Sequence, residues 1–222
     1  MNALELLLEG PVMPVIVVRD AAVAVDLAIA LTSGGIRTLE VTLRTSAAFA
    51  AIRLIRDAVP GAIVGAGTVL NRAQWERAVD AGAQFGVSPG LTSEVASAAR
   101  SANLPFLPGV GTATEALRAH DEGFSVQKLF PAEAIGGRAL LKALYGPLPD
   151  LRFCPTGGIN PENAPDYLAL PNVVCVGGSW LVPDEAVENR DWLRITRLAQ
   201  AAAGMRTRAA AALASTGGPL QG

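Results

Sequence analysis

One stretch decides the fold of this chain: Ser125-Val126-Gln127-Lys128-Leu129-Phe130-Pro131-Ala132-Glu133. It predicts a short buried strand that contains a lysine and is followed by a turn. A lysine is costly to bury, because its ammonium group loses its hydration. The chain has only two lysines, Lys128 and Lys142, among 18 Lys and Arg residues. Arginine stays protonated, whereas a buried lysine can lose its proton and attack a carbonyl group. A lysine whose stem packs in the core while its head reaches solvent is the alternative.

The composition excludes several classes of protein. With 222 residues, of which 50% are hydrophobic, the chain can bury a large core. A net charge of −2 provides neither a basic surface for nucleic acid nor a polybasic membrane anchor. No apolar run approaches the ~18 residues that span a bilayer. Residues 1–10 are acidic where a signal peptide is basic, so they predict a short helix of the mature protein.

The cysteines and the histidine point away from metal and triad chemistry. Cys154 and Cys175 each lie in an apolar run, which predicts buried free thiols in a reducing cytoplasm rather than a disulfide. His120 is the single histidine and lies in a polar helical stretch, so we expect it on the surface. This count disfavours a histidine-rich metal site and any Ser-His or Cys-His triad.

Short apolar runs alternate with alanine-rich amphipathic segments, at a spacing of about 20 to 25 residues, the length of one strand–helix unit. The predicted strands are 14–18, 38–43, 62–66, 84–87, 104–107, 125–129, 152–154 and 173–176. The predicted helices are 21–32, 47–58, 72–81, 93–102, 113–121 and 137–145. Strands this apolar indicate a parallel sheet that helices cover.

Eight such units predict an α/β fold closed as a (β/α)8 TIM barrel, with a short N-terminal helix. We expect a single domain over residues 1–208 and a frayed tail over 209–222, where alanine gives way to Gly, Ser, Thr and Pro. Pro105 is expected at the first residue of its strand. A doubly wound open sheet is the alternative. However, Gly65-Ala66-Gly67-Thr68 lacks the glycine spacing and the later acidic partner of a dinucleotide site.

In a barrel, chemistry gathers where the strands end. Period-2 alternation places Glu40, Thr42 and Arg44 on one face of the second strand, which can be the barrel interior. A buried acid is costly unless it is paired or used, so a structural pair of Glu40 with Arg44 or Lys128 stays open beside a catalytic role. Lys128 could attack a ketone to form an iminium, while Glu40 moves protons and Arg44 holds a substrate carboxylate.

Small residues follow the other strands. Gly67-Thr68, Ser88-Pro89-Gly90 and Pro108-Gly109 form tight turns that leave backbone groups open to a ligand, although each could be a simple turn. Gly157-Gly158 and Gly177-Gly178 follow the last two strands. Many barrels bind a phosphate at this position, with glycine N–H groups and a helix N-terminus around it. We therefore predict a phosphate site there.

Six motifs follow one another between residues 10 and 197: Leu39-Glu40-Val41-Thr42-Leu43-Arg44-Thr45, Gly65-Ala66-Gly67-Thr68, Ser88-Pro89-Gly90, Lys128-Leu129-Phe130-Pro131-Ala132-Glu133, Pro155-Thr156-Gly157-Gly158-Ile159 and Gly177-Gly178-Ser179-Trp180. Together they closely resemble the 2-keto-3-deoxy-6-phosphogluconate (KDPG) aldolases, the class I aldolases of the Entner–Doudoroff pathway. The resemblance implies a metal-free, homotrimeric (β/α)8 lyase, and the free thiols predicted above indicate that it is cytoplasmic. It also implies reversible cleavage of KDPG to pyruvate and D-glyceraldehyde 3-phosphate, with no cofactor beyond a covalent lysine–pyruvate Schiff base.

The same resemblance assigns roles to individual residues. Lys128 would form the Schiff base, and Glu40 would be the general acid and base. The expected substrate-binding residues are Arg44 and Thr68 at the pyruvate carboxylate, Pro89 and Phe130 around the pyruvyl group, Thr156 near the substrate hydroxyls, and Gly157, Gly158, Gly178 and Ser179 at the phosphate. No metal ligand is implied.

Other activities remain open from the sequence. The galactonate-series aldolase differs in the configuration at C4 of the substrate, and the resemblance implies that Thr156 favours the gluconate form, because an apolar residue is usual there in the galactonate-series enzymes. Cleavage of 4-hydroxy-2-oxoglutarate to pyruvate and glyoxylate needs the same lysine but no phosphate. A phosphosugar isomerase or epimerase would use Glu40 as the base and Lys128 as an electrostatic helper. A binding protein without catalysis is disfavoured, because a buried amine and a carboxylate coincide.

Overall fold

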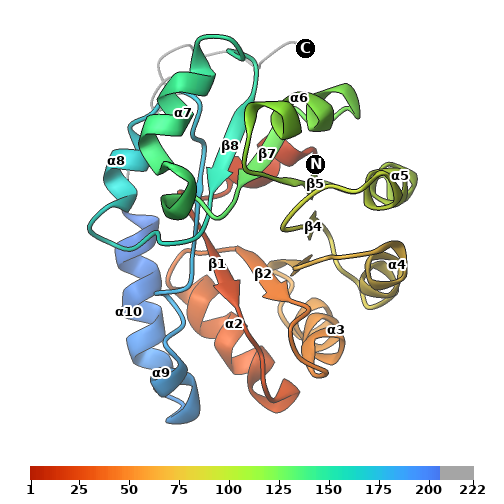
Figure 1. Ribbon diagram of the computed structural model, residues 1–222. Coiled ribbons are helices and arrows are strands. Elements are labelled where there is room, and N and C mark those ends of the chain that lie inside the picture. Colours follow the sequence, from red (N-terminus) through yellow and green to blue (C-terminus); the bar gives the residue numbers. More distant parts are fainter. Residues whose placement is uncertain (206–222) are drawn as a thin grey trace.

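The structure is a computed structural model, and it describes residues 1–205 (Figure 1). It shows an α/β fold in which a curled parallel sheet lies inside a ring of helices (Figure 1). The predicted tail over 209–222 lies outside the described residues. Among residues 1–205, no helix is both long enough and apolar enough to cross a bilayer.

The strands pair in two groups. Six of them follow the order β5-β4-β3-β2-β1-β9, and three follow the order β6-β7-β8, with parallel pairing throughout. Their bounds are β1 Val12–Ile16, β2 Thr38–Thr42, β3 Ile63–Gly67, β4 Gly86–Val87, β5 Phe106–Leu107, β6 Gly109–Val110, β7 Val126–Leu129, β8 Arg152–Pro155 and β9 Val176–Gly178. Pro108 alone separates β5 from β6, and parallel bridges Phe153–Val173 and Thr156–Gly177 connect β8 with the segment of β9.

Apart from α1, the helices lie on the outer face of the strands (Figure 1). They are α1 Ala3–Leu8, α2 Ala24–Ser33, α3 Ala48–Ala58, α4 Arg72–Asp80, α5 Ser93–Ala102, α6 Ala113–Asp121, α7 Gly137–Tyr145, α8 Ala164–Leu168, α9 Asp184–Glu188 and α10 Trp192–Ala203, with short 3-10 turns η1 Ala21–Val23 and η2 Glu133–Ile135. Side-chain oxygens cap several helix starts; for example, Thr92 accepts a hydrogen bond from Val95 N, and Thr112 accepts one from Glu115 N. Such caps satisfy backbone donors that the helix leaves free.

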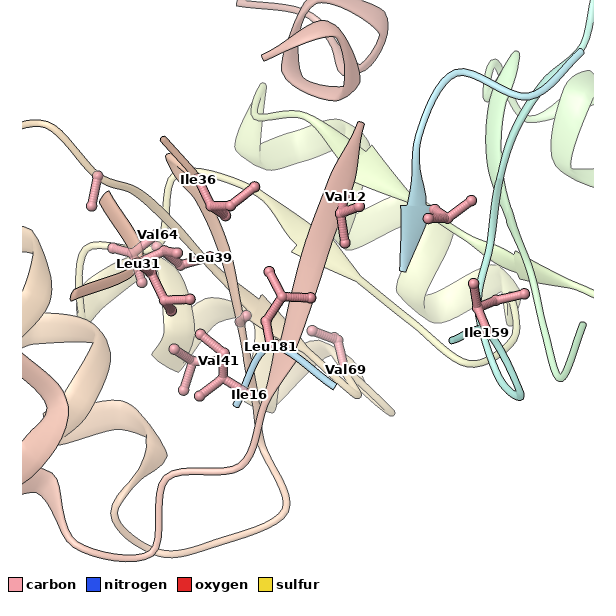
Figure 2. Close-up of a cluster of buried hydrophobic side chains, with 14 of the residues drawn as sticks. Val12, Ile16, Leu31, Ile36, Leu39, Val41, Val64, Val69, Ile159 and Leu181 are labelled. Atoms are coloured by element: carbon pink, nitrogen blue, oxygen red, sulfur yellow. The ribbon is translucent and has the colours of Figure 1, made fainter. Parts of the chain in front are cut away.

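Two hydrophobic clusters follow from the alternation along the strands. The larger one fills the layer between strands and helices, where Ile16 and Val41 gather with Leu31 of α2 (Figure 2). The smaller one contains Met13, Phe85 and Val126, which face the inside of the curled sheet. Leu6 and Leu7 of α1 belong to this inner cluster, so the N-terminal helix covers one end of the interior.

The observed elements agree with the predicted ones where the local pattern is strong. Helices α5, α6 and α7 match the predicted bounds, and the N-terminal helix is confirmed as α1. Strands β4 and β5 are shorter than predicted, and Pro105 precedes β5 rather than beginning it. The predicted segments do not include β6, α8, α9 or α10.

Candidate active site

The site is built around an ion pair in the interior of the sheet. Lys128 lies on β7 and is 6% exposed, and Glu40 lies on β2 and is 2% exposed. Lys128 Nζ is 3.3 Å from Glu40 Oε1. The alternative prediction, in which the ammonium group of Lys128 reaches solvent, is therefore wrong. A buried charge needs such a partner, because neither group is hydrated there.

Alternation along β7 explains why Lys128 faces inward. Val126 belongs to the inner cluster, so Lys128, two residues later, shares its face. Gln127 faces the opposite side, where its Nε2 donates hydrogen bonds to the carbonyls of Ala116 and Phe124. A buried glutamine thus fixes the outer face of β7, and the register of the strand leaves Lys128 in the interior.

Glycine on β3 makes room for the carboxylate. Gly67 pairs with Thr42 in the parallel register, and a Cβ at Gly67 would collide with the Glu40 carboxylate. The side chain of Glu40 therefore lies directly over the Gly67 backbone. Thr42 does not join the site: its Oγ1 donates a hydrogen bond to Ile16 O at 2.9 Å.

Arg44 and Thr68 follow the ends of neighbouring strands. Arg44 comes two residues after β2, is exposed, and makes no hydrogen bond or ion pair with any of residues 1–205. Of the two structural pairs considered for Glu40, only the pair with Lys128 is present in this part of the chain. Thr68 comes directly after β3 with φ +59°, a left-handed conformation that is rare for a β-branched residue. Such backbone strain is often found at functional sites.

Pro89 and Phe130 line a cavity beside the lysine. The cavity has a volume of about 1030 Å³ and extends between α5 and α6, where Arg118 is among its charged lining residues. Lys128 does not line this cavity, but its Nζ lies 5.1 Å from the centroid of the Phe130 ring. Phe130 therefore contacts both the cavity and the buried amine.

The two glycine pairs lie next to each other. Gly157 and Gly158 adopt φ +101° and +79°, values that favour glycine. The bridge Thr156–Gly177 joins the segment before this turn to β9, and a Cβ at Gly177 would collide with Thr156 Oγ1. Thr156 is buried, and a Cβ at Gly178 would overlap the Trp180 ring. Ser179 follows β9 and is exposed. The structure thus brings the predicted phosphate-binding residues to one place at the end of β8 and β9.

Sequence analysis missed one polar pair near this place. Tyr167 of α8 is fully buried, and its hydroxyl donates a hydrogen bond to Glu133 Oε1. Burial and the neighbouring Glu133 carboxylate raise the pKa of Tyr167 above its ordinary value, so it stays protonated and remains a donor. Glu133 stands in the lysine motif, which could have drawn attention to it. Nothing local in the sequence points to Tyr167.

The two cysteines and the histidine lie where the sequence predicts them. Cys154 and Cys175 are free and buried, as predicted, and burial raises the pKa of the Cys175 thiol. His120 is exposed, as predicted. Within residues 1–205, no group of three or more His, Cys, Asp and Glu side chains is placed to hold a metal ion.

Comparison with known proteins agrees with this geometry. The aldolase family described as KDPG and KHG aldolase matches residues 4–198. A 2-dehydro-3-deoxy-phosphogluconate aldolase of Pseudoalteromonas atlantica is 54% identical over 88% of this chain and 92% of its own. A KHG/KDPG aldolase of Escherichia coli is 53% identical over 90% of this chain and 94% of its own.

A solved structure extends the likeness to three dimensions. It is the KDPG aldolase of Legionella pneumophila, in which pyruvate is captured as a covalent carbinolamine intermediate. It superimposes with a TM-score of 0.90 at 45% identity, and the match covers 92% of this chain and 99% of that one. This chain, with its curled parallel sheet and its buried Lys128–Glu40 pair, therefore belongs to the KDPG and KHG aldolase family.

Proposed function

We propose that this chain is a class I aldolase that reversibly cleaves KDPG to pyruvate and D-glyceraldehyde 3-phosphate through a Schiff base on Lys128. One observation carries the proposal: a buried lysine lies 3.3 Å from a buried carboxylate inside the curled sheet. An amine in this position can act as a nucleophile once it has given up its proton. Membership of the family supports the same chemistry.

The first half of the reaction joins the substrate to the enzyme. The neutral amine of Lys128 attacks the C2 ketone, and the C2 oxygen takes a proton, which gives a carbinolamine. Glu40, 3.3 Å from the amine, then delivers a proton to the departing hydroxyl, so that water leaves and an iminium remains. The iminium withdraws electrons from the C3–C4 bond and prepares it for cleavage.

The second half breaks the carbon–carbon bond. Glu40 accepts the proton of the C4 hydroxyl while the electrons of the C3–C4 bond move into the iminium, which becomes an enamine. D-Glyceraldehyde 3-phosphate leaves, and the enamine takes a proton at C3. Water then adds to C2 of the resulting iminium, and pyruvate is released as Lys128 is regenerated. One carboxylate can serve each of these proton transfers because they occur around a single carbon framework.

The other site residues bind the two ends of the substrate. Arg44 and Thr68 hold the pyruvate carboxylate, because an exposed guanidinium and a hydroxyl follow neighbouring strands. Pro89 and Phe130 surround the pyruvyl group. Thr156 lies near the substrate hydroxyls. The phosphate is bound by Gly157, Gly158, Gly178 and Ser179. A glycine backbone without a side chain allows the phosphate to approach the N–H groups closely.

The finer architecture belongs to the same proposal. We propose a closed (β/α)8 barrel, supported by the Thr156–Gly177 bridge and by the single residue between β5 and β6. The barrel is a single domain over 1–208, followed by a frayed tail. It assembles as a homotrimer and works in the cytoplasm without a cofactor. The family membership supports the trimer and the absence of a cofactor. The two free thiols support a reducing compartment such as the cytoplasm.

Trapping with borohydride tests the proposal directly. Incubation with pyruvate and borohydride should add one reduced pyruvate to the wild-type chain, measured as intact mass, and nothing to Lys128→Ala. Absence of the adduct in the wild type, under conditions that trap a known Schiff-base aldolase, would contradict the Schiff-base mechanism. Lys128→Arg distinguishes the aldolase from the isomerase alternative. If Lys128 is only an electrostatic helper, the variant should keep some activity; if it forms the Schiff base, the variant should lose nearly all of it. Assays with KDPG, its C4 epimer and 4-hydroxy-2-oxoglutarate then rank the substrates.

A further inference from the structure

Glu133 stands in the lysine motif, five residues after Lys128, yet it takes no part in the proposed proton transfers. We infer that Glu133 and Tyr167 are positioning residues that hold the Gly157-Gly158 turn in the shape that receives the substrate phosphate. The inference rests on the proposed function, because it assigns phosphate binding to that turn.

The backbone after β7 runs along the turn. Ala132 N donates a hydrogen bond to Thr156 O at 2.8 Å, and Glu133 N donates one to Gly157 O at 3.1 Å. These bonds continue the pairing of β7 with β8 past the strand ends. The segment that carries Glu133 is therefore fixed to one side of the turn.

The side chain of Glu133 extends this contact to the second glycine. A Cβ at Gly158 would lie 2.7 Å from both Cβ and Cγ of Glu133, so the glutamate methylene covers the Gly158 backbone. The position of the methylene depends on the carboxylate, whose Oε1 accepts the hydrogen bond from Tyr167. Within residues 1–205 the exposed Glu133 carboxylate makes no other side-chain hydrogen bond and no ion pair, so this bond orders its side chain.

Helix α8 holds the turn from the other side. Asn163, directly before α8, donates from Nδ2 to Gly158 O at 3.0 Å. Tyr167 lies one turn further along the same helix and is fully buried, so its hydroxyl has a fixed place. The Gly157-Gly158 turn is thus held between the segment after β7 and the start of α8.

The hydrogen bond between Tyr167 and Glu133 also controls where the negative charge of Glu133 lies. A free Glu133 carboxylate beside the turn would repel a phosphate dianion, and the Tyr167 hydroxyl keeps this carboxylate turned toward α8. Loss of the hydroxyl should therefore weaken binding of the phosphate end of the substrate. It should leave the chemistry at Lys128 intact, because Tyr167 makes no hydrogen bond to Lys128 or Glu40.

Tyr167→Phe tests this with two measurements on one protein. The first is kcat and KM for KDPG; the second is the exchange of the pyruvate methyl protons with deuterium, which needs the Schiff base but no phosphate. We expect kcat/KM for KDPG to fall about tenfold, mostly through KM, which corresponds to ~1.4 kcal/mol. We expect pyruvate exchange to stay within about twofold of the wild type.

Three further variants keep the test decisive. Glu133→Gln retains an acceptor oxygen for Tyr167 and should remain within about twofold of wild type for KDPG. Glu133→Ala, at an exposed position, should reproduce the KDPG defect even if Tyr167→Phe fails to fold. Tyr145→Phe, on the exposed part of α7, removes a hydroxyl that makes no hydrogen bond within residues 1–205 and should change neither rate.

Two results would overturn the inference. One is an unchanged KM for KDPG in Tyr167→Phe or Glu133→Ala; the other is an equal fall in KDPG cleavage and pyruvate exchange, which indicates general damage. A wild type that shows no pyruvate exchange at all would overturn the proposed function instead.

Discussion

Lys128 Nζ and Glu40 Oε1 lie 3.3 Å apart, although 88 residues separate them in the chain. The two side chains come from β7 and β2 and meet inside the sheet. Burying such a pair gives little net stability, because both groups lose hydration. A pair of apolar residues could fill the same space at least as well. The geometry is therefore better explained by the reaction that it permits than by the stability of the fold.

Replacement of the carboxylate tests this relationship. Glu40→Gln keeps the size of the side chain but removes the group that accepts and returns protons. We expect kcat for KDPG cleavage to fall by a factor of about 10² to 10⁴, the usual contribution of general acid–base catalysis. Steady-state kinetics measures the loss, and borohydride trapping should still yield the pyruvate adduct, only more slowly.

The matched control makes the same change on the surface. Glu76→Gln removes an exposed carboxylate on α4 that pairs with Arg72 at 3.4 Å. Exposed pairs of this kind contribute little, so its kinetics should equal those of the wild type. An activity of Glu40→Gln close to that of Glu76→Gln would contradict a catalytic role for Glu40.

The space that Gly67 leaves for Glu40 leads to a second prediction. In Gly67→Ala the new methyl group would collide with the Glu40 carboxylate and push it away from Lys128. Since a displacement of about 1 Å can cost a factor of ~10² in rate, we expect a loss of that size in kcat. Gly61→Ala is the control, because a Cβ there meets no heavy atom of residues 1–205 within 4 Å. Equal activity in the two variants would show that Glu40 tolerates displacement.

Much of the fold could be predicted because its signals are local. Helices α5 and α6 have the predicted bounds, and Thr92 and Thr112 cap their starts. The inward direction of Lys128 follows from the apolar strand around it and from period-2 alternation. The order of the six motifs indicates the family without any knowledge of the contact between Glu40 and Lys128.

Other features depend on contacts between distant segments and leave no local trace. The Thr42 hydroxyl shares a face with Glu40 in the sequence pattern, but it is used by Ile16 O of the neighbouring strand. Tyr167 reads as an ordinary core aromatic, and only the folded chain shows its bond to Glu133. Helix α10 is a different case, since it lies outside the predicted segments although its buried residues Ile195, Ala199 and Ala202 follow helical spacing and the helix packs on α2.

The thiols of the interior provide a third prediction. Cys154 and Cys175 are buried, and burial raises the pKa of the Cys175 thiol, so less of the reactive thiolate is present at a given pH. At pH 8 the native chain should therefore react with iodoacetamide far more slowly than the chain unfolded in guanidinium, which should gain two labels. Intact mass measures the labels. Rapid double labelling of the native protein would contradict the packing of this interior.

Arg44 supports the last prediction, which concerns binding rather than chemistry. Its exposed guanidinium makes no ion pair within residues 1–205, so it is available to a substrate carboxylate. Arg44→Gln should raise the KM for pyruvate in proton exchange by a factor of about 10 to 100, the loss expected for a hydrogen bond between charged groups. The maximal rate should change much less, because the Lys128–Glu40 pair is untouched. Arg197→Gln, an equally exposed change on α10, should leave KM as it is. A normal KM in Arg44→Gln would mean that another residue binds the carboxylate.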